Sequence, residues 1–93
     1  MHYVYVLINQ DDQRLYIGQT ADLRRRLVEH QKYRANQLVY YEAYLDPSVA
    51  RKRERILKNH GTTWTRLKQR LDTSFKLAGK KLQGDHLVDR RQV

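Results

Sequence analysis

The sequence contains no cysteine among its 93 residues, which excludes disulfide bonds and thiolate metal sites. It also has no apolar run near the roughly 20 residues that a membrane-spanning helix needs. The first ten residues, MHYVYVLINQ, lack the charged start and long apolar core of a secretory signal. We therefore expect a soluble, cytoplasmic protein with no membrane partner and one small core.

Signatures of several common enzyme classes are missing as well. There is no glycine-rich phosphate loop, no pair of histidines at metal-ligand spacing and no nucleophilic-serine motif. Any chemistry therefore has to come from other combinations of residues.

Positive charge is concentrated in the second half of the chain. The formal net charge is +9. Residues 1–46 carry six basic and six acidic side chains, whereas residues 47–93 carry thirteen basic and four acidic ones. A concentrated positive field attracts phosphate backbones and favours a nucleic acid as partner, although many small soluble proteins are basic without binding one.

Three segments are typical of β-strands. Residues 2–9 (HYVYVLIN) and 14–18 (RLYIG) are rich in β-branched and aromatic residues and flank a polar turn, which predicts a hairpin. Residues 36–45 (NQLVYYEAYL) form the third predicted strand. Gly18 either ends the second strand or lets another backbone approach closely.

Three further segments have the apolar spacing and the end signals of helices. Thr20 is expected to cap a helix that reaches about residue 33. Asp46 and Pro47 mark the start of a helix over 47–60, which ends before Gly61. Thr63 is expected to cap a helix over 62–71.

The order β-β-α-β-α-α predicts an α+β domain over residues 1–73, with a three-stranded, mostly antiparallel sheet flanked by helices. From about residue 74 the periodicity fades, so we expect residues 74–93 to form a mobile tail.

The first predicted helix contains three consecutive arginines, and they cannot share one role because they point about 100° apart. Arg24 and Arg25 are expected to face water. Arg26 lies beside the buried stripe and four residues before His30, so the two side chains either face a cleft together or Arg26 forms a structural salt bridge.

Glu54 stands out in the second half of the chain. It lies on the same helical stripe as the apolar Ala50 and Leu57, and it is the only acid among the eight basic residues from Arg51 to Arg70. A carboxylate in such a position is paired or bound to a metal ion. An ion pair between Glu54 and an arginine of the helix is the structural alternative.

Tyrosine is unusually frequent, with seven residues against one phenylalanine. Tyr3 and Tyr5 share one face of the first strand, and Tyr16 on the second strand is able to join them. Strand tyrosines commonly pack with the hydroxyl at the edge of the core. A cluster beside Arg26 would instead suit proton transfer or contact with a phosphate.

These motifs together resemble the GIY-YIG nuclease family, in particular its small stand-alone bacterial members. The first motif reads Tyr3-Val4-Tyr5 and the second Tyr16-Ile17-Gly18, with Tyr5 and Tyr16 eleven positions apart. GQTADLRRRLVEH is similar to the helix that follows them in the family, and ARKRERILK to its A-x-x-R-E-x-x-L-K helix. The resemblance covers about residues 2–71.

The resemblance implies phosphodiester hydrolysis in DNA with one Mg²⁺ or Mn²⁺ ion. Glu54 would hold the metal and Arg26 would stabilise charge in the transition state. Tyr5, Tyr16 or His30 would be the general base. The basic residues expected to contact the nucleic acid are Arg51, Lys52, Arg55, Lys58, Arg66 and Lys68.

We thus expect a metal-dependent DNA endonuclease that is directed by DNA structure or damage, as in repair or recombination. A non-catalytic nucleic-acid-binding module with the same fold is the alternative. A domain that acts only when docked on a protein partner that supplies specificity is a third interpretation. Few residues here could read base edges, and the sequence does not separate DNA from RNA as substrate.

Overall fold

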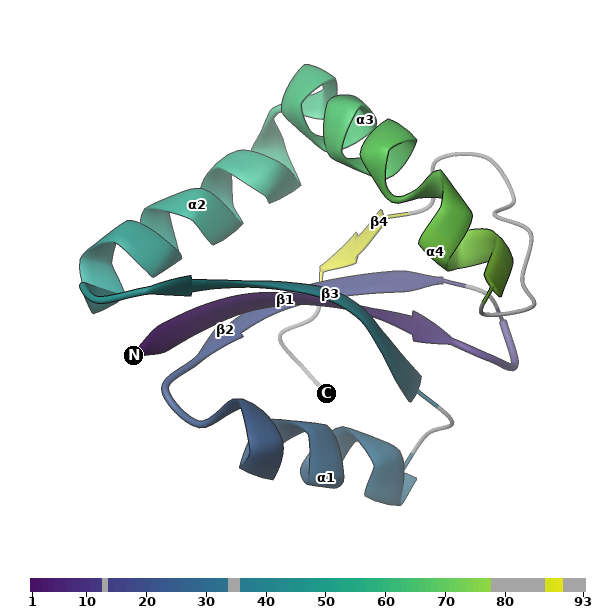
Figure 1. The fold of residues 1–93 in the computed structure, drawn as a ribbon, viewed down its shortest axis with the longest axis horizontal. Coiled ribbons are helices and arrows are strands. Elements are labelled where there is room, and N and C mark those ends of the chain that lie inside the picture. The colour runs from purple at the N-terminus through teal and green to yellow at the C-terminus, as the bar shows by residue number, and fades with distance from the viewer. Residues whose placement is uncertain (13, 34–35, 78–86, 90–93) are drawn as a thin grey trace.

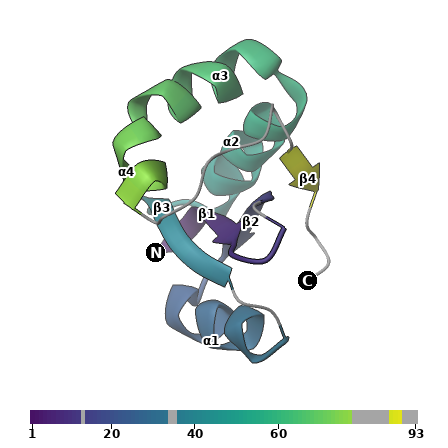
Figure 2. The same ribbon diagram turned by 90° about the vertical axis from the view of Figure 1, so that its right-hand side faces the viewer.

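The computed structural model describes residues 1–12, 14–33, 36–77 and 87–89. The helices and strands in this part of the chain are β1 (His2–Asn9), β2 (Leu15–Thr20), α1 (Leu23–Tyr33), β3 (Asn36–Tyr44), α2 (Pro47–Asn59), α3 (Gly61–Arg70), α4 (Asp72–Leu77) and β4 (Leu87–Asp89). The sheet lies between α1 on one face and α2 and α3 on the other (Figure 1), and a view turned by 90° shows the same three layers (Figure 2). None of the helices in these ranges has the length and apolar character needed to cross a membrane.

The predicted α+β class, with its order β-β-α-β-α-α, is confirmed. The sheet order is β3-β1-β2-β4, and β1 pairs antiparallel with both β2 and β3. A short fourth strand, which the sequence did not predict, pairs parallel with residues 15–17 of β2. Both α4 and β4 lie at or beyond the expected boundary near residue 73. The division into a domain and a mobile tail stays a prediction, because residues 78–86 and 90–93 lie outside the described residues.

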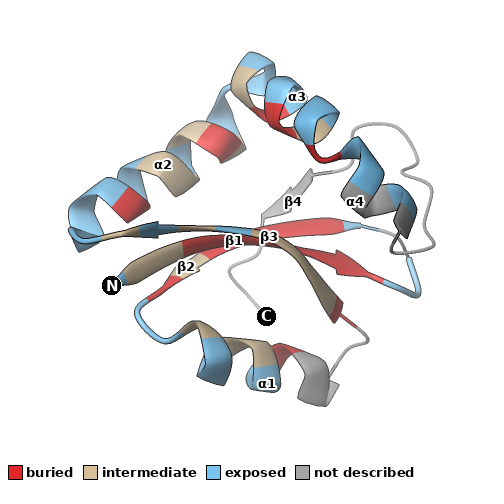
Figure 3. Cartoon of the chain, in the orientation of Figure 1, coloured by how far each residue is buried: buried red, intermediate tan, exposed pale blue. Residues whose placement is uncertain are grey.

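The central strand β1 is buried on both faces of the sheet. Val4, Val6 and Ile8 contribute to the core under α2 and α3, whereas Tyr5 and Leu7 contribute to a second core under α1. This alternation is the period-two pattern of a strand. Figure 3 shows the buried residues along β1 and β2 in the middle layer and the exposed ones on the outer faces of the helices.

A β-bulge changes which side chains of β3 face α1. The register against β1 shifts so that Val6 pairs with Tyr40 but Leu7 pairs with Leu38. Val39 is therefore the extra residue, and both Val39 and Tyr40 pack against the core under α2 and α3. The next residue along the strand, Tyr41, is the partner of Tyr5 and faces α1. Bulges commonly redirect side chains in this way.

Two local predictions near the start of α1 are wrong. Gly18 does not end the second strand, which continues to Thr20. The helix cap is Asp22, whose carboxylate accepts a hydrogen bond of 3.1 Å from the Arg25 backbone N–H. Thr20 instead accepts a hydrogen bond from the Asp22 N–H at 3.1 Å, so it shapes the turn before the cap.

The signals around α2 are confirmed, but the start of α3 differs from the prediction. The Asp46 carboxylate caps α2 by accepting a hydrogen bond from the Ser48 N–H, and Pro47 is the first helical residue. Only His60 separates α2 from α3, which begins at Gly61. Thr63 therefore lies inside the first turn of α3, because the chain passes from one helix to the next without a loop that Thr63 could cap.

A charged clamp joins α2 to β3. The Arg53 guanidinium donates to both oxygens of Glu42 at 3.0 Å, and the hydroxyls of Tyr40 and Tyr44 also donate to this carboxylate. Burial alone would raise the pKa of Glu42, but the hydrogen bonds from Arg53 and the two tyrosines outweigh it and hold the pKa below its ordinary value of 4.5. Burial and the bond to Glu42 raise the pKa of Tyr44 to about 12.

We predict that Glu42→Gln lowers the free energy of unfolding at pH 7 by about 1–3 kcal/mol, as expected for hydrogen bonds to a charged group. The pKa of Glu42 is lower in the folded than in the unfolded state. The stabilisation is therefore present above about pH 4.5 and is lost as the pH falls through the folded pKa. Urea unfolding at pH 7 and at pH 3 measures both effects.

The control is Asp72→Asn, which removes an ion pair with Lys76 whose side chains are 60% and 74% exposed. Such exposed pairs contribute at most about 1 kcal/mol. Equal losses for the two variants at pH 7 would show that the Glu42 clamp does not hold α2 to the sheet.

Candidate functional site

Tyr5 on β1 and His30 on α1 form a buried hydrogen-bonded pair. The Tyr5 hydroxyl and His30 Nε2 lie 3.1 Å apart, and the two rings meet edge to face with centroids 5.7 Å apart. Tyr5 is 5% exposed and His30 is 3% exposed. The structure therefore brings together two of the residues that the sequence suggested, and we call them the Tyr5–His30 pair.

Gly18 makes this arrangement possible. It is the β2 partner of Tyr5, and a Cβ atom at this position would lie 2.3 Å from the Tyr5 hydroxyl oxygen and 2.5 Å from Cζ. Only glycine leaves room for the tyrosine ring to lie across β2. The sequence suggested a strand end or a close backbone approach here, and the close approach is that of the Tyr5 side chain.

The pKa of His30 is lowered from its ordinary value of 6.5, first by burial and then by the positive charge of Arg26, while Glu29 opposes the shift. His30 is therefore neutral at pH 7. Within the described residues, His30 Nδ1 and Arg26 Nε are buried atoms without a hydrogen-bond partner. Most buried donors and acceptors in proteins have a partner, and a catalytic role is one explanation for an exception.

Arg26 lies one turn before His30 and is only loosely paired. Its NH1 atom is 3.6 Å from a Glu29 oxygen, which is long for a charged hydrogen bond, and its side chain is 36% exposed. Arg24 and Arg25 are exposed, as the sequence predicted. Arg25 Nε is 3.8 Å from a carboxylate oxygen of Glu29, and the Arg25 side chain is 69% exposed.

Tyr16 belongs to the same buried cluster as Tyr5. It is 4% exposed, pairs with Leu7 across the β1–β2 ladder, and packs under α1. The first and second tyrosine motifs thus meet on the α1 face of the sheet.

Glu54 lies on α2, in the helical layer on the other side of the sheet. Its carboxylate is 3.0 Å from the Lys58 ammonium, and the side chain is 20% exposed. The sequence allowed an ion pair with an arginine as the structural alternative, and the partner is a lysine. In the part of the chain that the structure describes, no group of three or more His, Cys, Asp or Glu residues gathers to hold a metal ion.

The rotation of α2 sends Glu54 toward β2. Ala50 and Leu57 face the core, and the clamp commits Arg53 to Glu42 on β3. Because successive helical residues are about 100° apart, Arg53 and Glu54 lie on the two flanks of this core-facing stripe. The flank with Glu54 is the one farther from β3.

The basic residues predicted to contact a nucleic acid lie on α2 and α3, on the opposite side of the sheet from α1 (Figure 1). Four of them are exposed and two are half-buried. The exposed ones are Arg51, Lys52, Arg55 and Arg66, and the half-buried ones are Lys58 and Lys68.

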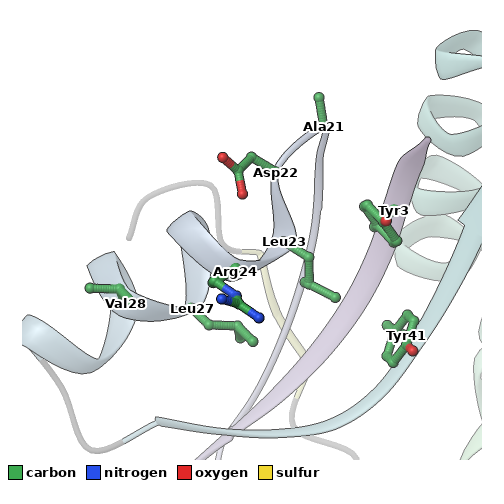
Figure 4. A pocket seen from close by; sticks show the side chains of 8 residues that line it. All are labelled: Tyr3, Ala21, Asp22, Leu23, Arg24, Leu27, Val28 and Tyr41. Atoms are coloured by element: carbon green, nitrogen blue, oxygen red, sulfur yellow. The ribbon is translucent and has the colours of Figure 1, made fainter.

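A groove of about 540 Å³ between α1 and the sheet is a feature that sequence reasoning missed. Figure 4 shows Tyr3 and Tyr41 on the sheet side of the groove and Arg24 and Leu27 on the helix side. Tyr3 was expected on the face of Tyr5, but the facing of Tyr41 depends on the bulge in β3. The sequence carries no signal for that bulge.

The family model for the GIY-YIG catalytic domain matches residues 1–67 of the chain. The protein belongs to the GIY-YIG family. Neither curated proteins nor solved structures gave a match. The matched region contains Tyr5, Tyr16, Arg26, His30 and Glu54, and membership of this endonuclease family supports a nuclease-type function on DNA in general terms.

For this GIY-YIG domain we predict that Gly18→Ala folds but loses DNA cleavage. The new methyl group has to displace the Tyr5 ring, which costs about 1–3 kcal/mol of stability. A displacement of about 1 Å at a reacting group lowers the rate roughly a hundredfold. Thermal unfolding and a cleavage assay on the same preparation separate the two effects.

Gly61→Ala is the matched control, because a Cβ at Gly61 meets no atom within 4 Å. Its stability should be unchanged or slightly higher, since alanine favours a helix more than glycine does. Wild-type cleavage by the Gly18→Ala protein would show that the position of the Tyr5 hydroxyl is irrelevant to the reaction.

Proposed function

We propose that this GIY-YIG protein is a metal-dependent DNA endonuclease that is directed by DNA structure or damage and acts in repair or recombination. The observation that carries the proposal is the buried Tyr5–His30 pair, whose hydroxyl lies over Gly18 with an arginine one helical turn away. A buried, neutral histidine bonded to a tyrosine hydroxyl is an arrangement suited to proton transfer.

The scissile phosphate would dock at the free end of β2. β4 pairs with residues 15–17, and no strand within the described ranges pairs with the outer edge of residues 18–20. The Tyr5 hydroxyl approaches this edge from the α1 face, and Glu54 is directed toward β2 from the α2 face. Groups from both layers can thus reach one phosphodiester across the edge of the sheet.

In this arrangement the neutral His30 accepts the hydroxyl proton of Tyr5 as Tyr5 takes a proton from the attacking water. This relay requires the tautomer of His30 that carries its proton on Nδ1. Arg26 would face the developing negative charge on the phosphoryl oxygens with its guanidinium, which is only loosely paired with Glu29. Tyr16 belongs to the same buried cluster as Tyr5 and Leu7 and would help to position the Tyr5 ring.

The residues present fit one Mg²⁺ or Mn²⁺ ion held by Glu54. Mg²⁺ commonly takes one or two carboxylates and completes its shell with waters and substrate phosphate, and Glu54 is a partly exposed carboxylate. When bound, the ion would supply Lewis-acid stabilisation of the phosphoryl and leaving oxygens. Lys58 balances the Glu54 charge in its present position.

DNA would contact the basic residues of α2 and α3 through its phosphates, because the exposed side chains there are suited to backbone contacts and not to a base code. A protein partner that supplies specificity is compatible with this arrangement. A binding module without catalysis is the rival function, and the following two variants separate the two.

We predict that Glu54→Gln lowers metal-dependent cleavage by orders of magnitude while DNA binding persists or tightens, because a negative charge leaves a basic surface. Arg26→Ala should lower the rate by roughly 10²–10³, the cost of one preorganised charge-stabilising donor. Cleavage of nicked, flapped, branched and duplex DNA with Mg²⁺, with Mn²⁺ and with EDTA measures both.

Arg25→Ala is the control on the same helix, since its side chain is 69% exposed and lies near Glu29. It should change the rate by a few-fold at most. A Glu54→Gln protein that melts at lower temperature but cleaves normally would identify Glu54 as a structural partner of Lys58 and remove the metal assignment.

The pH profile tests the role of His30. Because the pKa of His30 is lowered from 6.5, its neutral form persists to more acidic pH. The rate should therefore stay level down to below pH 6.5 and fall only as the pH passes through the lowered pKa. His30→Gln should lower the plateau and remove this acidic limb. An acidic limb that survives unchanged in His30→Gln would assign the titration to another group.

A further inference from the structure

The groove between α1 and the sheet contains an aromatic surface that the proposed reaction does not use. Tyr41 is 52% exposed, although it is a large aromatic residue in the middle of β3. Its ring meets that of Tyr3 edge to face, with centroids 6.1 Å apart and an interplanar angle of 63°. The two rings hold each other in place without stacking, which leaves ring surface open to the groove (Figure 4).

We propose that this groove binds an unpaired nucleobase of the DNA substrate, within one or two nucleotides of the phosphodiester that is cleaved. Tyr41 is the stacking surface and Arg24 the contact to the adjoining phosphate. This inference rests on the proposed endonuclease function and adds the form of DNA that the site accepts.

The position of the groove beside the Tyr5–His30 pair supports this assignment. Tyr41 is the direct β3 partner of Tyr5, and paired residues on neighbouring antiparallel strands have Cα atoms about 4.5–5.5 Å apart. Tyr3 is two residues before Tyr5 on the same face of β1. The groove therefore lies beside the backbone of Tyr5 on the α1 face, whereas the Tyr5 hydroxyl extends to the other side of β1, over Gly18 on β2. Neighbouring strands are about 5 Å apart, so a base one or two nucleotides from the cleaved bond can reach the groove.

The chemistry of the lining fits a nucleotide. Leu23 and Leu27 provide an apolar floor, and Arg24 on the helix side supplies a cation. Among the described residues that line the groove, Asp22 is the only acid, and its carboxylate caps α1. An aromatic surface with apolar neighbours and one cation is the combination that single-stranded nucleic acid binds, since any base can stack on it and the phosphate finds a positive charge.

The volume of the groove favours an unpaired base over a duplex. About 540 Å³ lies within the range of small-molecule pockets. A base inside a double helix is stacked on both sides and cannot reach Tyr41, whereas a base in a flap, gap or damaged site can turn out of the stack at little cost. The groove would thus give the enzyme a preference for DNA structure without a sequence code.

The test is a binding cycle between protein and DNA, measured by fluorescence anisotropy of the full chain in EDTA. The probes are a labelled flap DNA and the same DNA with an abasic residue at the first unpaired nucleotide. Wild-type protein should bind the abasic flap roughly five- to a hundredfold more weakly, the usual worth of one stacked base. Tyr41→Ala should lose a similar factor on the normal flap but less than twofold on the abasic one.

Tyr41→Phe keeps the ring and should bind both DNAs like the wild type. Leu45→Ala is the matched surface control, because Leu45 is 87% exposed and lies outside the groove lining. Arg24→Gln should reduce the slope of log affinity against log salt concentration by about one, whereas Tyr41→Ala should leave the slope unchanged.

Two outcomes would overturn the nucleobase assignment. Equal losses of Tyr41→Ala on both flaps would show that the ring does not contact that base. If Tyr41→Ala bound both flaps as tightly as the wild type, the groove would be assigned to a protein partner instead. Neither result affects the endonuclease proposal as long as the wild type cleaves DNA. If the wild type neither binds nor cleaves any of the DNAs, the proposed function itself fails.

Discussion

The structure depends on one constraint, which is that β1 must be buried on both of its faces at once. Its valines and Ile8 complete the core under α2 and α3, while Tyr5 and Leu7 complete the core under α1. A strand of this kind normally carries aliphatic residues on both faces. Here one face carries a tyrosine whose hydroxyl has to be satisfied, and His30 satisfies it. The polar pair and the small core are therefore parts of the same packing solution.

The two layers around β1 have different electrostatic characters. The layer with α2 and α3 carries the basic residues predicted to contact a nucleic acid, and the clamp between Arg53 and Glu42 joins α2 to β3. The layer with α1 holds the neutral, buried pair and the loosely paired Arg26. The sheet thus separates the basic surface of α2 and α3 from the buried pair, and the positive charge that lowers the pKa of His30 comes from Arg26 on its own helix.

Much of the fold could be predicted because its signals are local. The period-two pattern of residues 2–9 fixed the facing of Tyr5, and Asp46 with Pro47 marked the start of α2. The long-range features could not be predicted in the same way. No local pattern connects Arg53 with Glu42, eleven residues away on another element, and charged residues are too common for their pairing to be read from a sequence.

The candidate site was predictable in its residue types but not in its geometry. The spacing of Tyr5 and Tyr16 and the position of His30 on a helical stripe indicated a shared face. The reason for Gly18 required the structure, because a glycine in a strand is compatible with a bend, a strand end or a close contact, and only the packing decides among them. The edge-to-face contact of Tyr3 with Tyr41 could not be predicted either, because it depends on the bulge in β3.

The bulge at Val39 decides on which face of the sheet Tyr40 and Tyr41 lie. Removing Val39 would restore simple alternation and leave both tyrosines on their present faces, because Leu7 would still pair with Leu38 and Val6 with Tyr40. A regular strand that kept Val39 would instead pair it with Val6 and exchange the facings of the two tyrosines. One tyrosine would then leave the network around Glu42 and the other would leave the groove, although the sequence of the strand would be unchanged. Relatives aligned by sequence alone can therefore share both tyrosines and still present different surfaces, and the bulge between Leu38 and Tyr40 is the feature to compare.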